Sequence, residues 1–307
     1  MPVALSQIRD LLLPGLWGIS GKYGMIERQW PKIFRQTNSE MALERRAAMR
    51  YLGLAQLKQE GAPTSFDNAA GQRFVYNAEH LEIGLGYAIT RKAIDDNLYK
   101  AEFGPSNDGL MESFKETEEI YAANVLNTAT TFNQAVQGDG VSLINSTGHP
   151  IDPPFASIPN QPSPDVDLNE TSLLNALITI RSTWRDNAGL KIHARGRKVI
   201  APPNLEPICL RLFRSELRPG TAENDVNAIL GMNDSLKEGY MIFDYLTSSF
   251  AWFILTNHDG LIFFNRKPFE MDMSVEFTTD NLLVKGYQRY VPTYYDWRAI
   301  WGTFPLT

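Results

Sequence analysis

The sequence has little of what most disulfide, metal and cofactor sites require. Its single cysteine, Cys209, excludes an intrachain disulfide and a cysteine-rich metal site, and it fits a reducing compartment. The four histidines lie far apart and form neither an HxxxH nor an H-x-E pattern, so zinc has no obvious set of ligands. We therefore expect no metal ion and no cofactor.

Long apolar runs and leader-like segments are missing as well. No uninterrupted apolar stretch approaches the roughly 18–20 residues that a membrane-spanning helix needs, so we expect no membrane partner. The N-terminus has no cationic segment and no small-residue cleavage site, which argues against a signal peptide. With 43% hydrophobic and 21% charged residues, the 307-residue chain has the composition of a folded protein with a sizeable core.

Motifs for catalysis and phosphate binding are also absent. There is no GxSxG, no Walker loop, and no GxGxxG that opens a helix. Ser146, His149 and Asp152 are close in sequence, but catalytic triads are normally assembled from distant segments, and these residues occupy a Pro-flanked loop. Cys209 lies between apolar neighbours and is expected to be a small buried hydrophobe. We expect no catalytic residue and no enzymatic activity.

The strongest positive signal is a long helix. Residues 106–133 contain no proline and carry their larger apolar residues at helical spacing. N-cap residues at 106–108 and a Gly-Asp-Gly run at 138–140 predict that the helix spans 106–136. We expect an apolar face of Leu110, Phe114, Tyr121, Val125 and Phe132, and a solvent-exposed face of Glu116, Glu118 and Glu119.

The N-terminal third contains three further segments. Residues 1–36 mix Pro and Gly with large aromatic residues, which indicates an extended arm that buries its aromatic groups against something else, such as another chain. Thr37-x-x-Glu40 is a capping box and predicts a helix over about 38–59. Alternating apolar residues then predict a two-stranded ribbon, roughly 64–76 and 79–90, which needs a partner because an isolated ribbon is only marginally stable.

Two more helices are predicted in the middle of the chain. The capping box Asp167-x-x-Glu170 predicts a helix over about 168–186, and Asn204 opens another.

The C-terminal part is rich in strands. The apolar runs 250–256 and 260–265 flank Asn-His-Asp-Gly at 257–260, which is a hairpin signal. Residues 269–277 alternate between apolar and polar or acidic residues, which predicts a half-buried strand with one acidic face. A turn at 278–281 then leads into a strand at 282–291.

Charge is unevenly placed, although the net charge is only −6. From Lys22 to Glu60 there are eight Lys and Arg against four Asp and Glu, whereas from Glu216 to Asp280 there are eleven acidic residues against four basic ones. The two regions could attract each other across a subunit boundary, or both could simply be solvated faces.

The order of these elements resembles that of the major capsid proteins of tailed bacteriophages, and most of all the Mu-type major head subunits. The similarity covers nearly the whole chain. It rests chiefly on LGYAITRKAIDDNLY (85–99) with the long helix behind it, and on the ending FEMDMSVEFTTDNLLVKGYQRYVPTYYDWRAIWG. The resemblance implies an α+β fold of the Hong Kong 97 type.

The same resemblance implies a domain plan. It consists of an N-terminal arm and helix (1–60), an extended β-hairpin loop (61–90), a peripheral domain (91–166) with a spine helix at 106–136, an axial domain (167–262), and a return to the peripheral domain (263–307). Because the arm and loop fill residues 1–105, we expect a separate scaffold protein. Some relatives form covalent cross-links through a lysine on the extended loop. Residues 61–90 hold no lysine, so we expect none here.

The implied function is structural and non-enzymatic. The chain would self-assemble into pentamers and hexamers of an icosahedral phage head that encloses double-stranded DNA, with assembly in the host cytoplasm. Its partners would be copies of itself, scaffold, portal and decoration proteins, and packaged DNA contacted without sequence specificity. The alternatives are an encapsulin-type nanocompartment shell and a monomeric α+β hydrolase.

Candidate subunit-interface residues lie in the arm, in the basic segment and ribbon, and on the acidic strand. They are Trp17, Tyr23, Trp30, Arg45, Arg46, Arg50, Arg73, Phe74, Tyr76, Glu270, Asp272 and Glu276.

Overall fold

The chain folds into two compact units, each assembled from three separate segments. The structure, a computed structural model, describes residues 27–67, 71–95, 99–152, 156–215, 227–230, 232 and 234–306, without the side chains of 94–95 and 99–104. Unit 1 comprises Met1–Leu43, Glu79–Ala122 and Phe263–Pro292, and unit 2 comprises Glu44–Ala78, Ala123–Ile262 and Thr293–Thr307. Segments distant in sequence must therefore meet before either core is complete.

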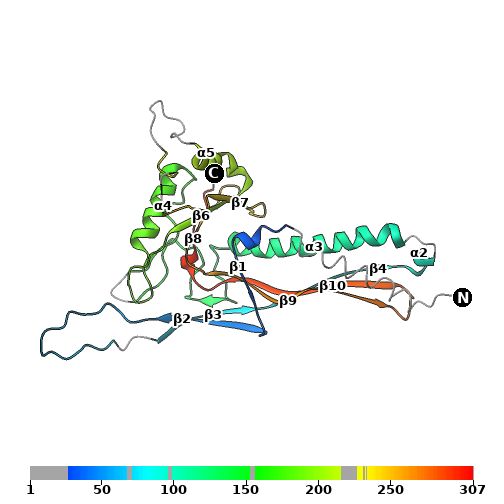
Figure 1. The fold of residues 1–307 in the computed structure, drawn as a ribbon, viewed down its shortest axis with the longest axis horizontal. Helices are drawn as coiled ribbons and strands as arrows, with labels where there is room; N and C mark the ends of the chain where they lie inside the picture. Colours follow the sequence, from blue (N-terminus) through cyan, green and yellow to red (C-terminus); the bar gives the residue numbers. More distant parts are fainter. Residues whose placement is uncertain are drawn as a thin grey trace. The chain divides into compact units, whose positions relative to one another are not determined.

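Unit 1 combines one long helix with a four-stranded sheet (Figure 1). Its helices are η1 (Trp30–Lys32), α2 (Arg91–Asp95) and most of α3 (Tyr99–Asn127). The sheet has the order β1-β9-β10-β4, formed by β1 (Arg35–Asn38), β9 (Leu261–Val275), β10 (Leu282–Tyr294) and β4 (Leu81–Ile89). β4 is antiparallel to β10 along its whole length.

The core of unit 1 lies between α3 and this sheet. Phe114 of the helix and Met273 and Val284 of the strands are each at most 2% exposed. Phe114 also meets the ring of Phe269 edge-on, with centroids 4.9 Å apart. A Cβ atom on Gly286 would lie 2.7 Å from Phe114 Cε2, so glycine lets the helix approach the sheet this closely.

Unit 2 contains two sheets, with orders β11-β8-β6-β7 and β2-β3-β5. Its strands are β2 (Leu43–Arg50), β3 (Gly71–Glu79), β5 (Gln137–Gly138), β6 (Gly196–Ala201), β7 (Tyr240–Ile242), β8 (Trp252–Thr256) and β11 (Ile300–Thr303). Its helices are α4 (Glu170–Thr183), η2 (Pro203–Leu205), α5 (Glu206–Arg214) and η3 (Trp297–Ala299). Every residue of β8 is buried, which accounts for its apolar sequence. No helix in the described ranges is long and apolar enough to cross a membrane.

Several sequence predictions are confirmed. Residues 269–275 of β9 alternate in burial, and a turn then leads into β10. α4 forms near its predicted position, although Asn169 and Ser172 make the capping box rather than the predicted pair. Cys209 is buried in α5, and burial raises the pKa of its thiol to about 12.

The predicted helix over 38–59 is wrong. The chain forms β2 there, and residues 51–67 contain neither helix nor strand. Burial in β2 alternates residue by residue, which is the period of a strand. The apolar spacing in 41–57 also fits a helix, but pairing of β2 with β3 overrides that local preference.

Two predicted strand pairings are also wrong, although the strands themselves exist. β3 lies between β2 and β5 instead of pairing with β4, which pairs with β10. β8 and β9 join different sheets, so residues 257–260 are a crossing and not a hairpin turn. Here the Asn257 side chain binds the backbone of Arg195 and His193 instead of closing a two-stranded turn.

The boundaries of the long helix differ from the prediction. α3 begins at Tyr99, with Pro105 inside it, and ends at Asn127. The predicted cap residues at 106–108 therefore lie within the helix. At the other end, the Asn127 side chain exchanges hydrogen bonds with the backbone of residues 245 and 247, a contact that sequence periodicity does not reveal.

Replacing Phe114 with alanine removes a large apolar group from between α3 and the sheet. We expect the free energy of unfolding, measured by urea denaturation, to fall by about 3–5 kcal/mol. Phe277→Ala is the matched control, because Phe277 is 99% exposed, and it should change stability by less than about 0.5 kcal/mol. Equal losses in the two variants would contradict this placement of the core.

Candidate functional site

The β2–β3 hairpin carries a large group of exposed apolar side chains. In its connecting loop Tyr51 is 70%, Leu54 82%, Leu57 99% and Phe66 86% exposed. The loop extends beyond the ends of both strands (Figure 1). Long loops without secondary structure are often functional, and clustered exposed apolar groups mark sites of protein–protein contact. The hairpin is therefore the candidate element for self-association.

Six of the sequence-predicted interface residues lie on this hairpin, and the structure places them against their own chain. Arg45 Nε donates to Asn77 Oδ1 at 3.0 Å, and the Arg46 guanidinium lies 4.8 Å from the centre of the Tyr295 ring. Tyr76 is buried, and this burial raises the pKa of its hydroxyl. A buried side chain has no surface to offer a second subunit, which argues against Tyr76 as an interface residue.

The other three hairpin residues lie where the two strands join the connecting loop. Arg50 Nε on β2 contacts Oδ2 of Asp152, and Arg73 Nη2 on β3 lies 3.1 Å from Oδ1 of the same carboxylate. Arg73 also lies over the ring of Phe74, 4.6 Å from its centre. The sequence gives no pattern that links Asp152 to either arginine, so this partner was missed.

The sequence neighbours Ser146, His149 and Asp152 form no triad. His149 Nδ1 lies 2.6 Å from Asp139 Oδ2, and the imidazole stacks on the ring of Trp297 with centres 4.4 Å apart. The side chains of His149 and Asp139 are 1% and 5% exposed, so the pair has a structural environment with no access for a substrate.

The predicted acidic face of β9 is present. Glu270 and Asp272 are exposed, and Glu276 is half-buried just after the strand. Asp272 lies 3.6 Å from Lys285 Nζ, an exposed pair of the kind that contributes little to stability. Beside it, β4, β9 and β10 line a depression of about 490 Å³. A charged sheet face of this kind suits contact with another protein surface.

The predicted aromatic contacts of the arm are only partly described. Trp17 and Tyr23 lie outside the described residues. Trp30 is 3% exposed and stacks on Phe263, with ring centres 3.8 Å apart. Its side chain is therefore used within its own chain.

The prediction that Glu118 and Glu119 face solvent is wrong. Both are buried: they bind the segment that enters η1, and Glu118 also accepts from Gln288 Nε2 on β10. Glu118 accepts from Arg28 Nε at 2.6 Å and from Trp30 Nε1 at 3.2 Å. Glu119 accepts from the backbone N–H groups of Gln29 at 2.5 Å and Trp30 at 3.0 Å. Burial raises the pKa of Glu119, and the two N–H donors oppose that rise because they favour the ionised carboxylate.

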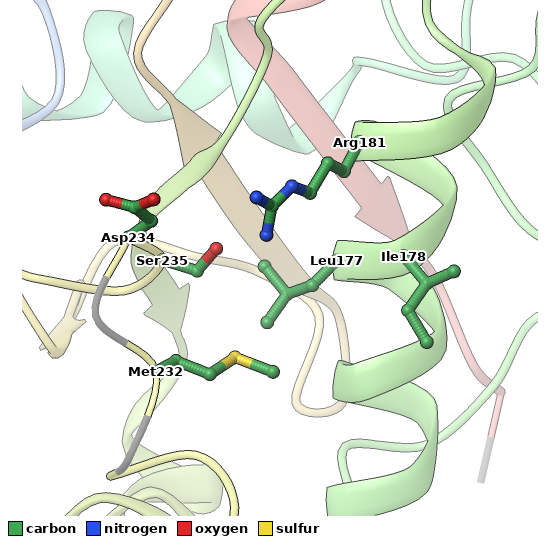
Figure 2. A pocket seen from close by; sticks show the side chains of 6 residues that line it. All are labelled: Leu177, Ile178, Arg181, Met232, Asp234 and Ser235. Atoms are coloured by element: carbon green, nitrogen blue, oxygen red, sulfur yellow. The ribbon is translucent and has the colours of Figure 1, made fainter.

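The structure also contains a small cavity, shown in Figure 2, where Leu177 and Arg181 of α4 approach Asp234 and Ser235. Its volume of about 200 Å³ lies below the roughly 300–1,000 Å³ of most ligand sites. Asp234 Oδ2 is bound to Arg195 Nη1 at 2.5 Å. Among the described residues, no group of three or more His, Cys, Asp or Glu is arranged to hold a metal ion.

Comparison with known proteins identifies the family. A model of the phage capsid protein family matches residues 78–302, which is most of the chain. The chain belongs to this family. It is a structural major capsid protein, and the resemblance to the major capsid proteins of tailed bacteriophages is confirmed. No curated protein matches the sequence.

Solved structures share the fold of the capsid protein at low sequence identity. A virus-like particle from Pyrococcus furiosus is 11% identical with a TM-score of 0.52, and the match covers 96% of this chain and 98% of that one. The procapsid of bacteriophage JBD30 is 11% identical with a TM-score of 0.53, and the match covers 99% of this chain and 77% of that one. The capsid of an empty GTA particle is 10% identical with a TM-score of 0.54, and the match covers 90% of this chain and 89% of that one. These likenesses confirm the α+β fold of the Hong Kong 97 type.

Glu119→Gln tests the contact between α3 and the segment that enters η1. The amide keeps the size of the side chain but offers one acceptor oxygen to two N–H donors. We expect faster hydrogen exchange at residues 29–34 and a loss of about 1–3 kcal/mol of stability. Glu112→Gln, on the exposed side of the same helix, is the control. It should change neither the hydrogen exchange of residues 29–34 nor the free energy of unfolding. Full protection of residues 29–34 in Glu119→Gln would contradict the assignment.

Proposed function

We propose that the capsid protein self-assembles into pentamers and hexamers that build an icosahedral head around double-stranded DNA, without any catalytic step. The observation that carries this proposal is the exposed apolar loop of the β2–β3 hairpin. A lone subunit leaves Leu54, Leu57 and Phe66 in water, whereas a neighbouring copy would cover them. Burial of these three side chains would contribute roughly 5–9 kcal/mol before the entropic costs of association.

The surface proposed to receive the loop is the acidic face of β9 on a neighbouring subunit. Arg45 and Lys58 are exposed on the hairpin, and Glu270 and Asp272 are exposed on β9. Opposite charges accelerate encounter and fix the register of two surfaces more than they add affinity. Assembly through this contact would weaken as the salt concentration rises.

This proposal moves the extended loop from residues 61–90 to the hairpin Leu43–Glu79. Lys58 then lies on the extended loop, so the absence of lysine from 61–90 no longer argues against a covalent cross-link. We retain the rest of the domain plan as a proposal, with α3, β9 and β10 in the peripheral domain and residues 167–262 as the axial domain.

Other partners are proposed from the resemblance. They are a separate scaffold protein, a portal, decoration proteins and packaged DNA contacted without sequence specificity, with assembly in the host cytoplasm and residence in the virion. The arm, including Trp17 and Tyr23, would add contacts between subunits. An encapsulin-type shell has the same fold, but membership of the phage capsid protein family favours the phage head.

The double variant Leu54→Asp with Leu57→Asp tests the role of the loop. We expect folded subunits that form no shells, because two charged groups at the loop would be buried without partners on assembly. Sucrose gradients and negative-stain microscopy, with scaffold co-expressed if the parent chain needs it, provide the measurement. Leu306→Asp is the control, since Leu306 is 95% exposed outside the hairpin, and it should assemble. Normal shells from the double variant would contradict the proposal.

A further inference from the structure

The β2–β3 hairpin is fastened to the rest of unit 2 by one carboxylate, at the point where both strands join the connecting loop. Arg50 Nε on β2 contacts Oδ2 of Asp152, and Arg73 Nη2 on β3 lies 3.1 Å from Oδ1 of the same carboxylate. The arginine side chains are 15% and 16% exposed, and that of Asp152 is 27% exposed. Because these groups are largely withdrawn from water, the contact is stronger than an ordinary surface ion pair. A single group outside the hairpin thus holds both of its strands.

A second group outside the hairpin also reaches both strands. The Asn187 side chain donates from Nδ2 to the backbone carbonyl oxygen of Met49 on β2 at 3.1 Å. The backbone carbonyl oxygen of Asn187 accepts from Arg73 Nη1 on β3 at 3.2 Å. The side-chain oxygen of Asn187 accepts from Arg298 Nη2 at 3.0 Å. Arg298 is in turn fixed by the backbone of Arg185, to which its Nε donates at 2.8 Å. The Asn187 amide is therefore held in one orientation.

Charge makes the Asp152 contact necessary. Burial lowers the pKa of Arg73, Asp152 opposes this effect, and the nearby Arg298 and Arg50 add to the lowering. Three cations, Arg50, Arg73 and Arg298, therefore lie close together where the strands join the loop. Without the Asp152 carboxylate, Arg50 and Arg73 would repel each other across the two strands.

Arg50 carries the connection one step further, toward the loop. Its Nη1 lies 3.4 Å from Asp67 Oδ1, and Asp67 Oδ2 accepts from the backbone N–H of Gly53 at 2.7 Å. Asp67 thereby ties together the two ends of the loop. The exposed side chains of Leu54, Leu57 and Phe66 begin beyond this point.

We propose that Asp152 and Asn187 are positioning residues that fix the direction in which the connecting loop leaves β2 and β3, and so hold the loop ready for a neighbouring subunit. This inference rests on the proposed function of the loop. A loop held in its bound orientation loses less conformational entropy on association. Asp152 and Asn187 therefore raise the rate and yield of assembly without contacting the neighbouring subunit.

Double electron–electron resonance on unassembled full-length subunits measures the direction of the connecting loop. Spin labels at Leu57→Cys on the loop and Ile178→Cys on α4 suit this purpose, because both positions are exposed and Cys209 is buried. We expect a narrow distance distribution in the parent and broad ones in Asp152→Asn and in Asn187→Ala. Shell yield without the labels should fall about tenfold. Asp108→Asn, at an exposed position on α3, is the control and should match the parent.

A conservative variant separates positioning from the mere presence of a substitution at residue 152. Asp152→Glu keeps the carboxylate that pairs with Arg50 and Arg73, so its distribution should be narrower than that of Asp152→Asn. Unchanged narrow distributions in both Asp152→Asn and Asn187→Ala, or a distribution in Asp152→Glu as broad as in Asp152→Asn, would overturn the inference. Failure of the proposed function would give a different result. The double variant Leu54→Asp with Leu57→Asp would then form normal shells, whatever the width of the spin-label distance distribution.

Discussion

Leu54, Leu57 and Phe66 are left in water by their own chain, and this constraint connects the fold of the subunit to its assembly. A subunit can carry such a loop only if its cores are stable without it. In unit 1, the contact of Phe114 with Met273 and Val284 provides that independent core. The apolar groups of the loop then remain available to stabilise contacts between subunits, where their burial adds to the free energy of association.

Carboxylates fix the two segments through which we propose that the subunit reaches its neighbours. Glu118 and Glu119 bind residues 28–30, which belong to the C-terminal part of the predicted arm. Asp152 holds both strands of the hairpin. In each case the carboxylate accepts from donors on a segment distant in sequence, and removing it would leave buried donors or adjacent cations unpaired. These contacts therefore both direct the segments and stabilise them.

The sequence revealed elements whose pattern is local and missed those set by distant partners. The helical spacing of Leu110 and Phe114 and the alternation of Met271 and Met273 follow directly from which face is buried, so α3 and β9 were predicted. Strand pairing joins segments far apart in sequence, so the pairing partners of β3, β4 and β8 were not predicted.

The candidate site was predicted to a similar extent. Arg50 and Arg73 were selected for their charge, and they do lie on the hairpin that we assign to self-association. Their partner Asp152 carries no local signal, because it follows in an irregular loop. Glu118 and Glu119 were assigned to solvent because ionised side chains are rarely buried. Donors on the segment entering η1, together with Gln288 of β10 for Glu118, explain the exception.

Electron cryomicroscopy of shells assembled from the full chain tests the central claim most directly. The account predicts that residues 51–67 of each subunit are covered by the β9 face of a neighbour, with Leu57 and Phe66 removed from solvent. A closed shell in which this loop lies free in solvent, with its apolar side chains uncovered, would contradict the account.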